Sequence, residues 1–341
     1  TATPKPTATA TPEQTAMPDP TATPEGNADL LTVGNYKIRL GMTFAEVNQE
    51  MGNSRIDNGC SPQGNDSYLY NPGGDYSSLI EVQFRNDTVV EMSTISGDFD
   101  YEGTVKAKGS ISDLTNNGFI EMGTFKYTIY NKTGDKEHIN VMVDLQRDSK
   151  VVYGIQIFDR SLGELKKLLL PENCSYTGDV NKYQGRLEAH YLNAYRAYHK
   201  CDLMTITSEG VAQTQSEYMA EKKTDTKSDA RNWDWIKRFE VDYGGGDPDE
   251  YDEGILYERY EAAHEGDSDN PYTPYEDMLH YRSEYTSVGS PDAFSAVTYT
   301  IAEQGETTKF YQYILMNEEE MNIECGFADG YVAFDFYTFF D

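Results

Sequence analysis

Apolar and polar residues alternate with a period of two along much of the first half of the chain. Such alternation is typical of half-buried β-strands. It predicts strands over residues 68–70 and 80–84, and a return strand over residues 89–95 after a turn at Asn86-Asp87. We therefore expect a β-meander in this part of the chain.

A short helix is predicted just before these strands. Thr43 is a favourable N-cap residue, and Glu46 follows it by three positions, which is the signature of a capping box. Val47 and Met51 then fall on one helical face. Gly52 is a suitable residue to end the helix, because glycine readily adopts the left-handed conformation found there.

The same pattern recurs sixty positions further along the chain. The pair Tyr70-Asn71 with Gly74-Asp75 reappears as Tyr130-Asn131 with Gly134-Asp135. Two copies of a helix and a meander give each sheet a surface to pack against, so we predict a duplicated β-rich domain over residues 31–175. The second copy comprises a helix over residues 111–117 and strands over residues 141–145 and 151–158.

The apolar periodicity becomes that of α-helices after Arg186. A second helix is expected after Ser208, with Lys222 and Lys223 at its C-terminal end, where they interact favourably with the helix dipole. The residues on the predicted buried faces are Leu187, Tyr191, Ala194, Tyr195 and Tyr198 in the first helix and Val211, Tyr218 and Met219 in the second.

Both helices resemble those of a known family. Residues 192–199 (LNAYRAYH) resemble the opening NxxR helix of the CAP (SCP/PR-1-like) superfamily, and residues 211–220 resemble its A-Q-x-x-A-x-x-M helix. The resemblance covers about residues 185–316 and implies an α-β-α sandwich. Its two central strands would then be residues 296–299 and 310–315.

The first domain also resembles a family. Residues 40–47 (LGMTFAEV) and 150–157 (KVVYGIQI) are similar to the CAP-associated N-terminal domain of Gram-positive bacteria. That family has no assigned catalytic residues, so the resemblance implies an architecture and not a reaction.

Together these patterns predict an α+β protein. A disordered tether over residues 1–30 precedes the duplicated helix-plus-β-meander domain, and a CAP-like sandwich follows over residues 176–341. The apolar segments 321–327 and 331–340 predict an extra C-terminal β-hairpin with a turn at Asp329-Gly330. We expect this hairpin to cover an edge of the sandwich or to pack on the first domain.

The CAP resemblance implies a cavity built from two His and two Glu residues. Glu261, within residues 260–266, falls at the position of one cavity glutamate. The segments in which the two histidines are expected, residues 224–229 and 281–284, contain none. We therefore interpret the cavity as degenerate.

Other residues offer a replacement binding cluster. Glu261 and His264 are three positions apart, so on a helix they would share a face, and His280 lies near the second expected histidine. A Glu/His/His cluster can hold a divalent metal or pair an acid with a base. The competing interpretation is that His264 and His280 are ordinary surface histidines.

Acidic residues dominate the composition, and the formal net charge is -30. Such a charge repels nucleic acid and anionic lipid, which argues against both as partners. Residues 240–270 contain twelve Asp or Glu residues and one Arg, a composition that can bind Ca²⁺ weakly.

The start of the chain indicates export. Residues 1–30 repeat Thr-Ala-Thr-Pro units, and proline-rich chains of this kind form extended spacers. We expect this linker to tether an extracellular protein to the cell surface, downstream of an export signal. No apolar run is long enough to span a membrane.

The four cysteines leave two alternatives open. Cys60, Cys174, Cys201 and Cys325 are widely spaced and form no CxxC pair, so they lack the spacing of a metal site. Two disulfides of undetermined pairing, or free buried thiols, are both compatible with the sequence.

No nucleophile elbow, P-loop, dinucleotide-binding glycine pattern or HExxH motif is present. The first hypothesis is therefore a non-catalytic binding or interaction protein of the cell envelope, without a cofactor other than a weakly bound Ca²⁺ or Zn²⁺. Its ligand would be a cell-wall polymer, a lipid or a protein. The alternative is a metal-assisted hydrolase or peptidase that uses Glu261, His264 and His280.

Overall fold

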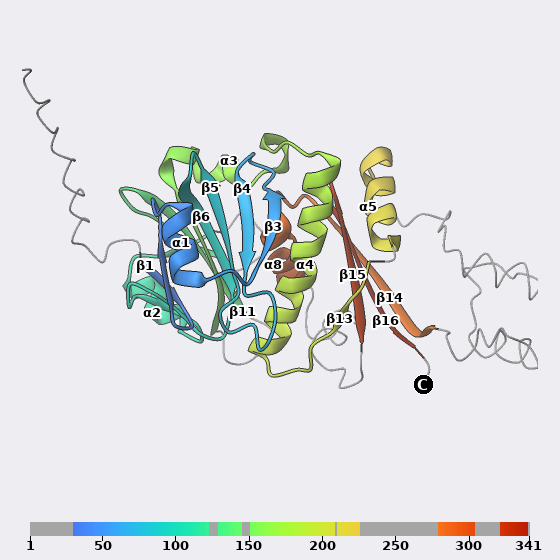
Figure 1. The fold of residues 1–341 in the computed structure, drawn as a ribbon, viewed down its shortest axis with the longest axis horizontal. Coiled ribbons are helices and arrows are strands. Elements are labelled where there is room, and N and C mark those ends of the chain that lie inside the picture. The colour runs from blue at the N-terminus through green and yellow to red at the C-terminus, as the bar shows by residue number, and fades with distance from the viewer. Residues whose placement is uncertain are drawn as a thin grey trace, which may run out of the picture.

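The described part of the chain forms three β-sheets, which are covered by helices (Figure 1). The structure is a computed structural model. It describes residues 30–122, 129–144, 151–208, 210–225, 279–303 and 321–339.

The largest sheet has eight strands in the order β3-β4-β5-β6-β12-β11-β10-β9. Two four-stranded meanders meet at the antiparallel pair of β6 and β12, and a helix precedes each meander. The helix-plus-meander pattern is therefore present twice, whereas its origin in a sequence duplication stays a prediction. The elements are α1 (Phe44–Met51), β3 (Arg55–Cys60), β4 (Asp66–Tyr70), β5 (Ile80–Arg85), β6 (Thr88–Ile95), α2 (Ile111–Asn116), β9 (Ile120–Glu121), β10 (Ile129–Thr133), β11 (Glu137–Asp144) and β12 (Val151–Asp159).

The capping box predicted for α1 is confirmed. The Thr43 side chain accepts a hydrogen bond from the backbone N–H of Glu46, and the Glu46 carboxylate accepts one from the backbone N–H of Thr43 at 2.7 Å. Ser110 and Asp113 form the same arrangement at the start of α2. A small four-stranded sheet lies beside these helices, in the order β2 (Tyr36–Arg39), β1 (Leu30–Val33), β7 (Phe99–Tyr101), β8 (Val105–Lys106).

The third sheet belongs to a three-layer sandwich, as the sequence predicted. Its strand order is β13-β15-β16-β14, with α4 and α8 on one face and α5 on the other. The helix predicted after Arg186 begins earlier, at Gly178, where Thr177 is the N-cap. The elements are α4 (Gly178–Tyr198), β13 (Thr205–Ile206), α5 (Val211–Lys222), β14 (Leu279–Val288), α8 (Ala293–Glu303), β15 (Asn322–Ala328) and β16 (Tyr331–Phe339).

The strand predicted over residues 296–299 is wrong, because these residues belong to α8. Every residue from 293 to 301 is buried, so the helix has no polar face that would reveal its period. Asp292 accepts a hydrogen bond from the backbone N–H of Ser295 at 2.7 Å and thereby caps the helix. The other predicted central strand, residues 310–315, lies outside the described residues.

The C-terminal hairpin is present, but its predicted position is wrong. β15 and β16 are the two central strands of the sandwich rather than a cover over its edge. Phe327, Phe334 and Phe336 are fully buried in the core beneath α4 and α8. This run is strongly apolar because it forms the middle of a sheet covered on both faces.

Helix α4 lies between the large sheet and the third sheet (Figure 1). One continuous apolar core contains residues of both sheets, of α4 and of α8, such as Leu69, Tyr191, Phe294 and Phe334. The predicted division of the chain after residue 175 stays a prediction. The chain segments between β12 and α4 form η1 (Arg160–Leu162), α3 (Leu165–Leu168) and η2 (Pro171–Asn173).

Candidate functional site

The residues predicted to form a binding cluster are only partly placed. Glu261 and His264 lie outside the described residues, as does the acidic segment 240–270. His280 lies near the start of β14, at a register irregularity between Leu279 and Tyr281. Convergence of Glu261, His264 and His280 therefore stays a prediction.

An acidic row crosses the third sheet. Asp335 on β16 lies directly opposite Glu324 on β15 and directly opposite Glu284 on β14. Glu324 and Asp335 are 3% and 2% exposed. Like charges directly opposite each other in a sheet repel, so this row favours a positively charged or hydrogen-bond-donating neighbour.

One such neighbour is the start of α5. The backbone N–H of Gly210, the N-cap residue of α5, donates a hydrogen bond to the Glu324 carboxylate. A helix N-terminus carries a partial positive charge, so it stabilises a carboxylate placed there. The row lies on the face of the sheet that α5 covers, because Ala333, on the same side of β16 as Asp335, packs against α5. The acidic row and His280 thus belong to the same sheet.

A further buried carboxyl group lies on the opposite face. Glu188 of α4 is fully buried, and neither of its carboxylate oxygens has a hydrogen-bond partner. Burial raises the pKa of Glu188 well above its usual value, which favours the neutral acid. Burial also raises the pKa of the Cys325 thiol, and the carboxylates of Glu188, Glu324 and Asp335 add to this effect.

Two histidines that the sequence analysis did not single out have interior partners. The His138 ring contacts Thr133 Oγ1 and the Gly163 carbonyl oxygen, each at 3.0 Å. Nδ1 of His190 lies 3.1 Å from the Tyr76 hydroxyl. Burial, with the nearby charge of Arg186, lowers the pKa of His190 to about 4, so this imidazole is neutral at pH 7.

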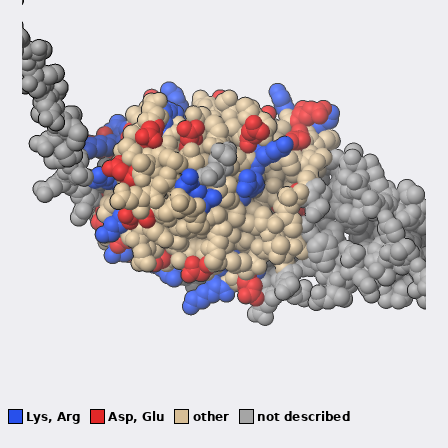
Figure 2. Space-filling model, viewed as in Figure 1, with Lys and Arg blue, Asp and Glu red and all other residues tan. Residues whose placement is uncertain are grey.

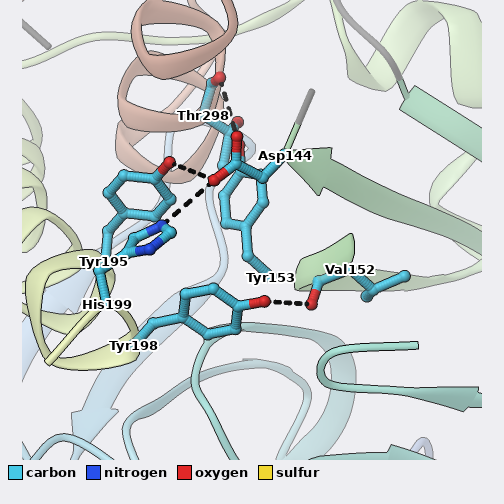
Figure 3. A network of polar contacts seen from close by, with 7 residues as sticks. All are labelled: Asp144, Val152, Tyr153, Tyr195, Tyr198, His199 and Thr298. Atoms are coloured by element: carbon cyan, nitrogen blue, oxygen red, sulfur yellow. Dashed lines mark hydrogen bonds and ion pairs between the residues drawn. The ribbon is translucent and has the colours of Figure 1, made fainter. Parts of the chain in front are cut away.

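A third histidine belongs to the polar network in Figure 3, where α4 ends against β11. Nε2 of His199 lies 3.2 Å from Asp144 Oδ2 as an ion-pair contact, and both side chains are at most 5% exposed. The Tyr195 hydroxyl donates a hydrogen bond to the same carboxylate oxygen at 2.8 Å. The Tyr153 hydroxyl donates to the Thr298 carbonyl of α8, at 3.4 Å. The network thereby links the large sheet to α4 and α8.

The structure decides between the two cysteine alternatives for the described part of the chain, which includes all four residues. None of them forms a disulfide. Burial raises the pKa of the Cys174 thiol to about 12, so its reactive thiolate form is scarce at neutral pH. Within the described residues, no group of three or more His, Cys, Asp or Glu side chains is arranged to hold a metal ion.

Comparisons with known proteins find similarity of structure only. No model of a protein family matches the sequence, and no curated protein matches it. An extracellular protein containing an SCP domain from Bacillus anthracis has a similar structure, with a TM-score of 0.59 and 12% sequence identity over 96% of this chain and 99% of that chain. A cysteine-rich secretory protein from Staphylococcus aureus matches with a TM-score of 0.51 and 12% identity, over 87% of this chain and 91% of that chain. At this identity the likeness concerns the fold.

Proposed function

We propose that this protein, which has the fold of the CAP superfamily, is a non-catalytic binding module of the bacterial cell envelope. The CAP-like sandwich would provide the binding surface through the predicted residues Glu261, His264 and His280, since Glu324 and Asp335 are buried on the face that α5 covers. The large sheet and α4 would hold this surface rigidly. No helix among the described residues has the length and apolarity needed to cross a bilayer.

The observation that carries the proposal is that three histidines make contacts inside the fold. His138, His190 and His199 each contact an interior partner, so these rings stabilise the fold. The CAP-like architecture is thus combined with imidazoles that serve packing, which supports a scaffold more than a catalyst. Fold alone does not confer activity.

The net charge of the protein restricts the kind of ligand that it can bind. Lys and Arg are interspersed with Asp and Glu on the face drawn in Figure 2, whereas the whole chain carries a net charge of -30. A polymer rich in phosphate would be repelled overall. Carboxylates accept hydrogen bonds, so the predicted binding residue Glu261 would suit ammonium groups or sugar hydroxyls. A peptide-bearing wall glycan supplies both.

Co-sedimentation of the full chain with purified Gram-positive cell walls tests the proposal, with neutral lipid vesicles as a second arm. We expect saturable binding to the walls that Glu261→Gln weakens. Asp100→Asn is the matched control, because Asp100 lies on β7 of the small sheet. Circular dichroism would verify that both variants fold.

The soluble fraction of the same assay is analysed for released wall fragments. A bound protein that leaves the wall intact supports the proposal. Fragments that appear with wild type and disappear with Glu261→Ala would overturn it in favour of a hydrolase. Equal binding by wild type and Glu261→Gln would place the ligand elsewhere and remove Glu261 from the proposal.

A further inference from the structure

The face of the large sheet that lies against α4 and α8 carries a row of buried polar residues. Glu81 on β5, Ser93 on β6, Gln156 on β12 and Asn140 on β11 lie opposite one another across four adjacent strands. None of these four residues is more than 3% exposed. Glu91, two positions before Ser93 on β6, is 1% exposed on the same face. A polar surface of this size is unusual inside a protein.

Several polar atoms in this surface have no hydrogen-bond partner. They include both amide atoms of Asn140, Oε1 of Gln156 and Oε2 of Glu91. Two further atoms are also unpartnered: Oδ2 of Asp292, at the start of α8, and Oε1 of Gln63, in the connection after β3. A buried polar group without a partner destabilises the folded state, because it has lost its hydrogen bonds to water. Unpartnered groups gathered in one place indicate a bound species that would satisfy them.

Two of these side chains are in direct contact, and Asp292 and Gln63 influence the group electrostatically. Gln156 donates a hydrogen bond from Nε2 to Glu91 Oε1 at 2.9 Å, which leaves its carbonyl oxygen unpartnered. Burial raises the pKa of Asp292. Hydrogen bonding by Ser295, Gln156 and Gln63 lowers the same pKa, but by less than burial raises it. The charge of Asp292 in turn raises the pKa of Glu91, after burial as the main cause.

We propose that Glu91, Asp292, Gln156 and Gln63 form an internal site for a hard divalent cation of the Ca²⁺ type. The unpartnered atoms of all four residues are oxygens, two from carboxylates and two from amides. Ca²⁺ binds carboxylate and amide oxygens in flexible geometry, whereas Mg²⁺ demands near-ideal octahedral coordination and retains water. Two carboxylates balance the charge of the ion and cease to repel each other.

The location gives this ion a structural consequence. Gln63, Glu91 and Gln156 come from the large sheet and its β3–β4 connection, whereas Asp292 begins α8 in the sandwich. A cation held by all four residues would fasten the two halves of the molecule together. Gln63 is only half-buried, whereas Glu91, Gln156 and Asp292 are buried.

Calcium titration of the full, chelator-treated chain tests the proposal by calorimetry and by thermal unfolding with and without Ca²⁺ and Mg²⁺. We expect one Ca²⁺ site in the wild type that raises the melting temperature. Glu91→Gln and Asp292→Asn should each weaken this site at least about tenfold and abolish the calcium-dependent rise. Two variants guard against the case in which one of them fails to fold.

Glu81→Gln is the matched control. Glu81 is buried on the same face, but its two oxygens accept hydrogen bonds from Ser67 at 2.6 Å and Tyr191 at 2.7 Å. This variant should retain the calcium-dependent rise in melting temperature. Identical titrations for wild type and Glu91→Gln would overturn the proposal, because calcium would then bind only elsewhere, such as the acidic segment 240–270. A Glu91→Gln variant that is more stable than wild type at pH 8, with or without calcium, would also overturn it and identify protonated carboxyl groups in place of a cation.

Discussion

The two faces of the large sheet are both buried, yet they are stabilised differently. One face, which includes Ile80, Val82 and Ile157, packs against α1, α2 and the small sheet in an apolar core. The other face presents Glu81 and Gln156 to α4 and α8. Apolar burial depends on area and shape, whereas each buried polar group needs its own partner. We therefore expect the stability of the apolar face to be insensitive to pH and ions, and that of the polar face to depend on both.

The largest expected effect comes from the apolar face. Ile157 is fully buried there, so Ile157→Ala removes apolar contacts and leaves a cavity. We expect a loss of about 4 kcal/mol in the free energy of unfolding, measured by urea denaturation. The loss should be equal at pH 5 and pH 8. Ile120→Ala is the control, because Ile120 is 70% exposed and should change stability by less than about 0.5 kcal/mol.

A loss that varied with pH would contradict the proposed division between the faces. It would mean that the apolar core transmits the titration of the polar face, so that the two surfaces could not be treated as independent.

The polar face should show its own signature through Glu81. Burial raises the pKa of this carboxyl group to about 7, with hydrogen bonds from Ser67 and Tyr191 in the opposite direction. The pKa of Glu81 is higher in the folded state than in the unfolded state, so the folded protein holds this proton more tightly. The contribution of the protonated Glu81 to stability is therefore present in full below about pH 4.5 and is lost as the pH rises through 7. This shift corresponds to about 3 kcal/mol.

Unfolding curves of wild type and Glu81→Gln between pH 4.5 and pH 8, in a chelator, measure this effect. Relative to wild type, the unfolding free energy of Glu81→Gln should increase by about 3 kcal/mol as the pH rises over this range. A constant difference would show that Glu81 does not titrate in this range.

The sequence predicted the apolar face better than the polar one. The alternation in residues 80–84 indicated a strand, as the structure confirms, and Val82 is buried in the apolar core. The same alternation indicates a half-buried strand, but the polar residues Glu81 and Gln83 are buried as well. Local periodicity reports which residues share a face and not what covers that face. The covering elements lie far away in the sequence, since α4 begins at Gly178 and α8 at Ala293.

The wrong sequence predictions for the sandwich have a related cause. Residues 296–299 are apolar or β-branched and favour a strand by propensity, but burial in α8 overrides this preference. The missed signal was Asp292, a good N-cap residue just before the apolar run. The candidate site was less predictable still, because the acidic row is formed by strand pairing between β14, β15 and β16. Pairing of distant strands cannot be inferred from spacing along one strand.

A smaller effect is expected where the polar face meets the end of α4. Tyr195→Phe removes the hydrogen bond to Asp144 and leaves the ring in place. We expect a loss of about 1.5 kcal/mol in unfolding free energy, since the acceptor is a carboxylate. Tyr198→Phe is the matched control, because its hydroxyl donates to the neutral carbonyl of Val152 and should contribute less. Equal losses would indicate that the Asp144 charge contributes nothing beyond an ordinary acceptor.

The smallest expected effect concerns the N-caps of α1 and α2, the helices that cover the apolar face. Thr43→Ala removes the N-cap of α1, and Ser110→Ala removes that of α2, so the two helix-plus-meander units can be compared directly. Each substitution should cost about 1 kcal/mol in unfolding free energy, measured by urea denaturation. Thr43→Ala should also raise the pKa of Glu46, which hydrogen bonds from Thr43 now lower. Because α1 buries Val47 and Met51 while α2 buries Leu114, a much larger loss in one variant would show which unit depends more on its helix.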